Sequence, residues 1–518
     1  MAIRPIGIRE PFPQPWRNRC RRRYLADCRS SLDRSLIEIG WHALRTHRMV
    51  SYLLIMRTFF LNWIVAMTLG TAAHADNLSA APTDAEILNI LTDRIDKQQQ
   101  SVGIVVGIID ADGRRIVAHG HPAKGDPRPV DGRTVFEIGS VTKVFTALLL
   151  ADAIEKGTLR LDTPVSTLLP PGVAMPDDKE EPVTLKDLAT HMSGLPRLPT
   201  NLDPTDTSNP YADYGTAKLY AFLSHHKPLR RPGVEHEYSN LGAGLLGHAL
   251  ALKAGLSYEE LVISRITAPL DMKDTAISSQ PGWAERRATD HNAALEPVRD
   301  WDLNALQGAG ALRSTTNDLL IFLEAAMGKT SSPLAPAFTM LLATRQPLGN
   351  GGDDQQALGW VISGKGDEQI IWHNGGTGGY RSFVGYRPST GIGVVALSNA
   401  STEVGVDDIG QHLLNRNAPL APANVRRTAI TVDPTSYDAY VGTYRLAPSF
   451  ELTIFRDGDR LFAQATGQDR IEIFPEAEHR FFAKLIDAQI SFTVTGTRAG
   501  SLTLHQGGRD SPAPRIEK

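Results

Sequence analysis

A serine and a lysine three residues apart can serve as a nucleophile and its base. The stretch FEIGSVTKVFT contains such a pair, Ser140 and Lys143. A serine hydroxyl is a weak nucleophile until a base within hydrogen-bond reach takes its proton. On a helix, residues i and i+3 share one face, so we expect Lys143 beside the Ser140 hydroxyl, with apolar neighbours lowering the lysine pKa. The pair alone is a weak motif, because an N-capping serine followed by a solvated lysine has the same spacing.

Two later segments carry groups that would complete such a site. Tyr238-Ser-Asn240 precedes a helical pattern. A phenol near ammonium groups can move protons, and the Asn240 amide can bind a substrate amide, although a tyrosine here also suits simple packing. In the segment His373-Asn-Gly-Gly-Thr-Gly-Gly379, glycines within a strand pattern indicate close backbone approach, against the alternative of a flexible loop. One N–H of that strand would form an oxyanion hole with the N–H of Ser140.

The three segments together resemble the three motifs of the penicillin-recognising serine hydrolases, most closely the class C β-lactamases. FEIGSVTKVFT resembles the nucleophile motif, PGVEHEYSN the tyrosine-x-asparagine motif, and WHNGGTGGYRSFVGYRP the third, strand-borne motif. PVTLKDLATHMSGLP, ITAPLDMKDTAI and GAGALRSTTNDLLIFL are also typical of the family, and the likeness covers residues 83–415. The resemblance implies a serine β-lactamase/DD-peptidase fold and an acyl-serine mechanism without a metal or organic cofactor.

The resemblance also implies roles for individual residues. Ser140 would attack a carbonyl, Lys143 and Tyr238 would handle its proton, and the N–H groups of Ser140 and Gly376 would hold the oxyanion. Asn240 would contact the substrate amide. The residues expected to bind substrate are Asn240, His373, Asn374, Gly376 and Thr377.

The third motif departs from the family pattern. Class C β-lactamases have Lys-Thr-Gly where this chain has His373-Asn374-Gly375. Histidine is mostly neutral at pH 7, so a permanent charge is lost, and Arg381 is a candidate to restore it. Relatives with histidine here include D-amino-acid peptidases and esterases. Three functions therefore stay open: hydrolysis of a β-lactam or D-amino-acid amide, a carboxylesterase on the same scaffold, and a non-catalytic penicillin-binding-like module.

The surrounding elements must position these groups. Helical spacing predicts helices over 83–100, 140–155, 184–191, 242–255 (following Asn240) and 257–266, and Asp112-Gly113 predicts a hairpin near the start. Three strand-like runs follow residue 370. Strands at both ends with helices between them predict an α/β (α+β) fold, in which helices flank an antiparallel sheet beside a helical subdomain.

A second domain follows a proline- and alanine-rich linker at 417–435. Alternating apolar residues divided by turns, as at Asp457-Gly458, predict a small all-β sandwich or barrel, which resembles lipocalin-like modules. We place the catalytic domain at 76–430 and the β domain at 431–518.

The N-terminal 75 residues have the character of a targeting segment. They are rich in arginine and hold both cysteines, Cys20 and Cys28. Residues 56–75 have a positive start, an apolar run and Ala73-His74-Ala75, which predicts a signal peptide cleaved near Ala75 rather than an uncleaved anchor. Residues 1–55 would be a non-native upstream extension, with a transit peptide as the alternative.

Charge and targeting together limit the partners. The net charge is −3, and the body after residue 75 is acidic without a basic patch, which argues against nucleic acid. We expect a periplasmic or secreted protein that acts on a small-molecule or peptidoglycan-derived substrate and meets the membrane only transiently, through its signal peptide.

Overall fold

The computed structural model describes residues 81–516 apart from 177–180, 228–229, 350–351, 423–426, 428, 448–449, 467–469, 484–487 and 507–508. The predictions for the upstream extension, the signal peptide and both cysteines lie outside the described residues. Within the described residues, no helix is long and apolar enough to cross a membrane.

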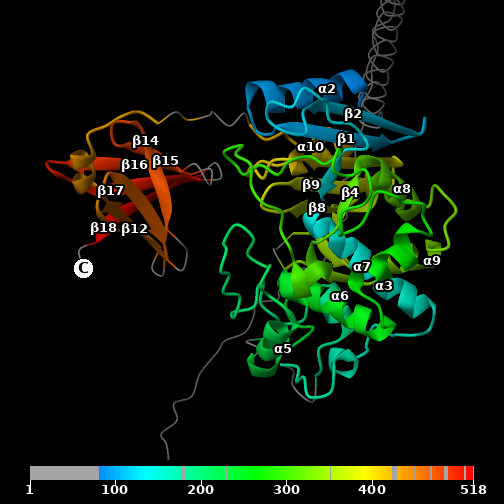
Figure 1. Ribbon diagram of the computed structural model, residues 1–518. Coiled ribbons are helices and arrows are strands. Elements are labelled where there is room, and N and C mark those ends of the chain that lie inside the picture. Colours follow the sequence, from blue (N-terminus) through cyan, green and yellow to red (C-terminus); the bar gives the residue numbers. More distant parts are fainter. Residues whose placement is uncertain are drawn as a thin grey trace, which may run out of the picture. The chain divides into compact units, whose positions relative to one another are not determined.

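An eight-stranded antiparallel sheet forms the centre of the catalytic region (Figure 1). Its middle strands are apolar and buried on both faces, as expected for strands covered by helices on each side. In spatial order the strands are β2 (Arg114–Gly120), β1 (Gly103–Ile109), β10 (Ile392–Ser398), β9 (Arg381–Arg387), β8 (Ile370–Gly376), β7 (Val361–Ser363), β6 (Gln355–Ala357) and β5 (Arg345–Pro347).

Helices cover both faces of this sheet. α2 (Asp84–Thr92) and α10 (Asp407–Leu414) pack on one face, where Ile87 and Ile409 join the apolar side chains of β1 and β10. α8 (Thr316–Ala326) packs on the other face and belongs to the main core. The predicted fold class is therefore confirmed: an antiparallel sheet flanked by helices.

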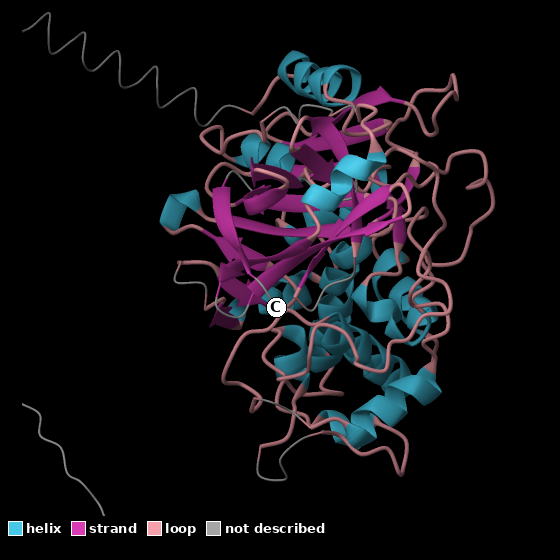
Figure 2. Cartoon of the chain, turned by 90° about the vertical axis from the view of Figure 1, so that its left-hand side faces the viewer, coloured by secondary structure: helices cyan, strands magenta, loops and turns pink. Residues whose placement is uncertain are grey.

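A helical region adjoins that second face (Figure 2, helices in cyan). Helix α3 is apolar on all sides and buried over most of its length, as expected of a helix inside the core. The helices of this region are α3 (Thr142–Glu155), α4 (Leu185–Ala189), α5 (Thr216–His225), α6 (Asn240–Ala254), α7 (Tyr258–Val262) and α9 (Ala335–Ala343).

A short two-stranded sheet leads into helix α3. β3 (Val135–Glu137) pairs with β4 (Arg313–Thr315), and a 3-10 turn over Gly139–Val141 follows β3 directly. Strand β3 thus fixes the position at which α3 begins. Packing of the buried residues of α3 in the core holds the rest of the helix.

The C-terminal domain is a closed eight-stranded antiparallel barrel. Sequence analysis left a sandwich or a barrel open, and pairing of the first strand with the last closes the sheet. Its core is rich in aromatic side chains, among them Tyr444, Phe481 and Phe492. The strands are β11 (Gly442–Ala447), β12 (Phe450–Asp457), β13 (Arg460–Ala465), β14 (Ile471–Ala477), β15 (Arg480–Ala483), β16 (Ala488–Thr495), β17 (Arg498–Gln506) and β18 (Arg509–Ile516).

Candidate active site

Ser140 lies in a tight turn at the start of helix α3. The preceding Gly139 has a φ of +48°, a conformation that favours glycine. A Cβ on Gly139 would also lie 2.7 Å from the backbone nitrogen of Gly376. The turn and strand β8 therefore touch backbone to backbone, and a side chain at Gly139 would push them apart.

Lys143 points back at the serine. Its Nζ donates to Ser140 Oγ at 2.9 Å and to the carbonyl oxygen of Ala309 at 2.7 Å. The side chain is 3 % exposed. Burial lowers the pKa of Lys143 and the charge of Arg197 lowers it further, whereas the Tyr238 phenol opposes the shift. A larger share of the lysine is therefore neutral and able to accept a proton than in water.

Tyr238 lies beside the lysine. Lys143 Nζ is 4.9 Å from the centre of the Tyr238 ring, and the Cζ of Arg197 is 5.1 Å from the same point. The His191 ring packs on Tyr238 at 4.5 Å, and its Nδ1 accepts from the backbone N–H of Ser239 at 3.1 Å. The Ser239 hydroxyl accepts in turn from a backbone N–H in the first turn of α6. The loop holding Tyr238 is thus fixed by both a histidine and a helix cap.

Strand β8 completes the site from the opposite side. A Cβ on Gly375 would collide with the Ile138 carbonyl and come within 3.0 Å of the Ser140 nitrogen. The hydroxyl of Ser382, on the neighbouring strand β9, donates to that same carbonyl at 2.8 Å. Glycine is therefore required where β8 passes the serine, and β9 ties the turn to the sheet.

His373 is buried on this side of β8. It is 2 % exposed, and its ring centre is 6.4 Å from that of Tyr238. Burial and the charge of Lys143 lower the pKa of His373 to about 3. Its Nδ1 lies 2.6 Å from the Asn374 carbonyl oxygen, so this nitrogen carries the proton of a neutral ring. His373 therefore provides no positive charge at neutral pH.

Asn374 and Arg381 are not brought to the serine. The amide of Asn374 donates to the carboxylate of Asp407, on the face of the sheet covered by α10. Arg381 donates to the backbone carbonyls of Thr377, Tyr380 and Ser401. The expectation that Asn374 binds substrate through its side chain is not supported by this orientation, and Arg381 does not replace the missing lysine, because strand alternation directs both side chains away.

A pocket opens next to Ser140. The pocket is small, and no charged residue lines it. Tyr211 and Trp301 form an aromatic wall with their rings 5.4 Å apart. The lining residues are Gly139, Ser140, Tyr211, Asn240, Trp301, Leu303, Leu306, Ala309, Gly310, Gly376 and Thr377. Of the residues expected to bind substrate, Asn240, Gly376 and Thr377 are therefore at the pocket.

Sequence reasoning missed three residues of this site: Arg197, Tyr211 and Trp301. Each comes from a loop without helical or strand periodicity, so no pattern indicated it. Arg197 does follow directly on the family-like stretch THMSGLP, and that position was the available signal.

A buried charge network lies behind the pocket. The carboxylates of Glu137, Asp290 and Asp300 lie within 4.8 Å of one another, close enough to share a cation. Arg313 pairs with Glu137 at 3.1 Å, and Arg287 pairs with Asp300. Burial raises the pKa of Asp290 to about 8, with the neighbouring carboxylates adding to the effect. Two guanidinium groups and a bound proton thus supply the positive charge that a metal would otherwise provide.

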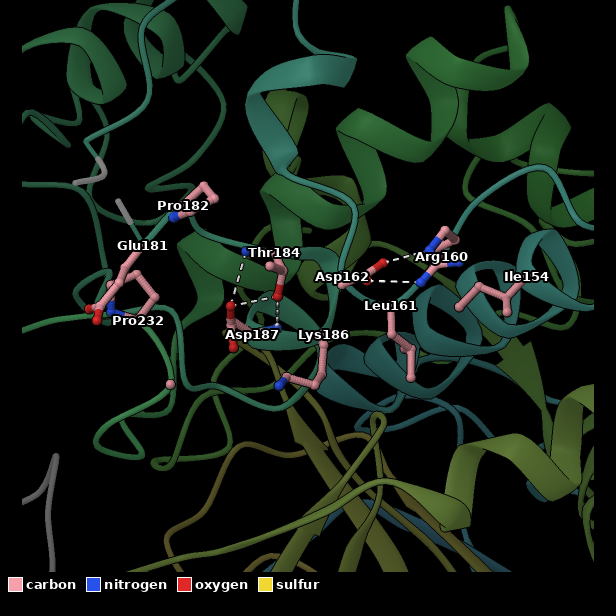
Figure 3. Close-up of a pocket in the computed structure, with 11 residues that line it drawn as sticks. Ile154, Arg160, Leu161, Asp162, Glu181, Pro182, Thr184, Lys186, Asp187 and Pro232 are labelled. Atoms are coloured by element: carbon pink, nitrogen blue, oxygen red, sulfur yellow. Dashed lines mark hydrogen bonds and ion pairs between the residues drawn. The ribbon is translucent and has the colours of Figure 1, made fainter. Parts of the chain in front are cut away.

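Another pocket lies away from the three motifs, between the end of α3 and the start of α4 (Figure 3). The polar groups at its rim bond one another: Arg160 pairs with Asp162 at 2.9 Å, and Thr184 caps α4 with Asp187. It contains no nucleophile next to a base, so we place the chemistry at Ser140.

The sheet, the helical region and the Ser140–Lys143 contact are those of a serine hydrolase. The chain belongs to the beta-lactamase family: the family model described as Beta-lactamase matches residues 88–415. A second model, described as a domain of unknown function (DUF3471), matches residues 426–514, which contain the barrel.

Curated relatives cover most of the catalytic region. The chain is 28 % identical to a beta-lactamase of Pseudomonas fluorescens over 347 residues, 61 % of this chain and 93 % of that protein. It is 26 % identical to penicillin-binding protein 4* of Bacillus subtilis (strain 168) over 475 residues, 83 % of this chain and 98 % of that protein.

Solved structures of similar proteins share this fold. A class C beta lactamase from Rhodobacter sphaeroides has a TM-score of 0.52 at 26 % identity, covering 61 % of this chain and 94 % of its own. A penicillin-binding protein homologue from Pyrococcus abyssi, described as octameric, shares the fold with a TM-score of 0.56 at 22 % identity. It covers 83 % of this chain and 99 % of its own.

Proposed function

We propose that the protein cleaves a β-lactam or a D-amino-acid amide bond through an acyl-serine intermediate. The observation that carries this proposal is the buried Lys143 amine, 2.9 Å from the Ser140 hydroxyl. A neutral amine at that distance can take the hydroxyl proton as the oxygen attacks a carbonyl.

The nucleophile and the oxyanion site act together in this scheme. As Ser140 Oγ bonds to the carbonyl carbon, the carbonyl oxygen becomes negative. The N–H groups of Ser140 and Gly376 are the donors we assign to that oxygen. The close approach of Gly139 to the Gly376 nitrogen supports the assignment, because it brings strand β8 against the turn that carries Ser140.

The proton then has to reach the leaving group. Lys143 holds it after the attack, and the Tyr238 phenol next to that amine is placed to pass it to the departing nitrogen. Collapse of the tetrahedral intermediate breaks the C–N bond and leaves Ser140 acylated. Water attacks the ester in a second step, with the same groups in reverse, and releases the acid.

Asn240 is the residue we assign to the substrate amide. It lines the pocket at the first position of α6, and its side-chain oxygen has no hydrogen-bond partner among the described residues. A buried amide oxygen without a partner is costly, so a substrate N–H would satisfy it.

A carboxylesterase is the second candidate function, and one observation favours it. The neutral His373 stands where class C enzymes have a lysine for the substrate carboxylate, so the third motif would accept an uncharged ester. A non-catalytic binding module is the weakest candidate, because Ser140, Lys143 and Tyr238 are all present and in contact.

The proposed cellular location rests on the N-terminal sequence. A signal peptide ending near Ala75 would export the protein to the periplasm or outside the cell, where peptidoglycan-derived substrates occur. The barrel would then be exported with the catalytic domain.

Intact mass spectrometry tests the proposal. The purified protein is mixed briefly with benzylpenicillin, ring opening is followed in the same tube, and Ser140→Ala serves as the control. A lasting adduct on the wild type alone indicates a peptidase that the drug blocks. Fast ring opening without an adduct indicates a β-lactamase. Neither adduct nor ring opening, together with hydrolysis of p-nitrophenyl acetate by the wild type only, would replace the proposal by the esterase.

A further inference from the structure

The substrates of the proposed function pose a charge problem for this site. Penicillins and peptides ending in D-alanine carry a carboxylate close to the bond that is cleaved. The pocket has no charged lining residue, and His373 is neutral. Lys143 is buried and must lose its proton to act as base. A carboxylate bound here therefore needs a cation from elsewhere.

Arg197 is exposed and lies next to two residues of the site, Asn240 and Tyr238. Its backbone carbonyl accepts from the N–H of Asn240 at 3.0 Å, which anchors the residue to the pocket wall. Its guanidinium lies 5.1 Å from the centre of the Tyr238 ring. Arg197 thus borders two residues of the site, Asn240 and Tyr238.

Apart from its contact with the Tyr238 ring, the guanidinium of Arg197 has no ion-pair or hydrogen-bond partner among the described residues. The acidic residues nearest in sequence to Tyr238 are Glu235 and Glu237, and both pair with Arg230. An exposed guanidinium held by its backbone, with neighbouring acids already paired, is suited to bind a carboxylate in a bidentate manner.

We infer that Arg197 is a specificity-determining residue that binds the substrate carboxylate, in place of the lysine that the third motif lacks. The inference rests on the proposed function and narrows it. Substrates with a free carboxylate next to the scissile amide are favoured, and substrates with a free amine at that end are repelled. In this arrangement the positive charge that binds the substrate carboxylate lies beside Tyr238, whereas the lysine of the class C enzymes lies on the strand that corresponds to β8.

The distances allow this role. Lys143 Nζ and Arg197 Cζ lie 4.9 and 5.1 Å from the same ring centre, so the two cations are at most about 10 Å apart. This upper limit is comparable to the Debye length of about 8 Å at physiological salt. Because Arg197 is exposed, we expect its contribution to binding of the substrate carboxylate to decrease as the salt concentration rises.

Matched substrates test the inference. The first pair is diacetyl-L-lysyl-D-alanyl-D-alanine and its C-terminal carboxamide, and the second is benzylpenicillin and its methyl ester. The protein is used in full as wild type, Arg197→Ala and Arg197→Lys. Arg231→Ala is the matched control, since this exposed arginine pairs with Glu181 and does not border the pocket. Hydrolysis or acylation rates give kcat/KM for each substrate.

The inference predicts a loss of discrimination. In Arg197→Ala, kcat/KM for the carboxylate member of a pair falls roughly 10- to 100-fold, mostly through KM, and the ratio of carboxylate to neutral substrate approaches one. Arg197→Lys keeps part of the ratio, because lysine offers a charge without the planar fork. The Arg231→Ala control keeps the wild-type ratio.

The two possible failures can be told apart. If the wild type is active and Arg197→Ala keeps its preference for the carboxylate, or loses activity equally on both members of a pair, the inference on Arg197 is overturned and the proposed function stands. If the wild type neither becomes acylated at Ser140 nor turns over either pair, the proposed function fails, and the inference falls with it.

Discussion

Replacing Lys143 by methionine separates its role as a base from its role in packing. Methionine keeps an unbranched side chain of similar length in α3 and removes the amine that contacts Ser140 and the Ala309 carbonyl. Loss of a general base lowers the acylation rate by about 10² to 10⁴, which corresponds to about 3–5 kcal/mol of transition-state stabilisation. We expect a loss in this range, with Ser140 still in place.

The stability effect of the same change is smaller. The Ala309 carbonyl loses its donor, which costs about 1–3 kcal/mol for a buried acceptor. Removal of a buried amine, whose burial disfavours the charged form, offsets part of this cost. We therefore expect the variant to fold, with a melting temperature within several degrees of the wild type.

The assay is the rate of acylation by benzylpenicillin as a function of pH. Protonated lysine cannot accept a proton, so the wild-type rate rises with pH through the lysine pKa, which burial places below the usual 10.5. This rise disappears in Lys143→Met. The control is Lys156→Met at the C-terminal end of the same helix, where the amine pairs with Asp152 at 2.7 Å and lies far from the serine.

Two results would refute the reasoning. A folded Lys143→Met variant that acylates within tenfold of the wild type would show that another group removes the serine proton. An equal loss in Lys143→Met and Lys156→Met would point to damage of the helix instead of loss of a base.

Three further predictions concern β8 and its surroundings. Gly375→Ala abolishes activity and lowers stability by about 1–3 kcal/mol because its Cβ would overlap the nucleophile turn, whereas Gly500→Ala, with open space around it, is nearly neutral in urea unfolding. Asn374→Ala leaves kcat within about threefold but destabilises the fold by about 1–3 kcal/mol, because buried Asp407 loses its donor; a kinetic loss at full stability would contradict this. Asp290→Asn flattens the pH dependence of stability. The raised pKa of Asp290 gives stability that is complete below about pH 4 and is lost as pH rises toward about 8, by at most about 1.4 kcal/mol per pH unit, and a wild type equally stable across this range in urea unfolding would refute it.

The site could be predicted from the sequence wherever its residues lie on regular elements. Ser140 and Lys143 share a helix face, so their contact follows from a spacing of three. Asn240 begins α6, as the helical pattern indicated. The glycines of β8 mark close approach, and the structure shows that the backbone they approach is the serine turn.

Other parts of the site depend on three-dimensional contacts that no local pattern encodes. Neighbouring residues of a strand point to opposite faces of the sheet, so His373 and Asn374 cannot both point at the serine. Because the third motif contains both residues, we had expected both to bind substrate. Arg197, whose guanidinium lies beside Tyr238, is in a loop whose path is set by backbone hydrogen bonds to α6. Loops of this kind follow no periodicity, so their side chains are placed only by the finished fold.

Local sequence patterns also failed to indicate part of the C-terminal barrel. Alternation indicated several of its strands, but β18 contains Pro512 and Pro514, which argue against a strand. Both prolines lie opposite β17, and β11 pairs with β18 only at Arg515 and Ile516, beyond them. No alternating pattern indicated β18, although the predicted all-β domain is confirmed.

Pairing of β1 with β10 has a consequence for synthesis of the protein. These strands lie side by side in the sheet although Gly103–Ile109 is made early and Ile392–Ser398 near the end of the catalytic region. β1 can pair with β2 early, but its other edge has no partner until almost 400 residues have been made, so the full sheet forms late. Gly375 and Gly376, which close around Ser140, are also translated late, so the proposed site is incomplete until strand β8 has been made.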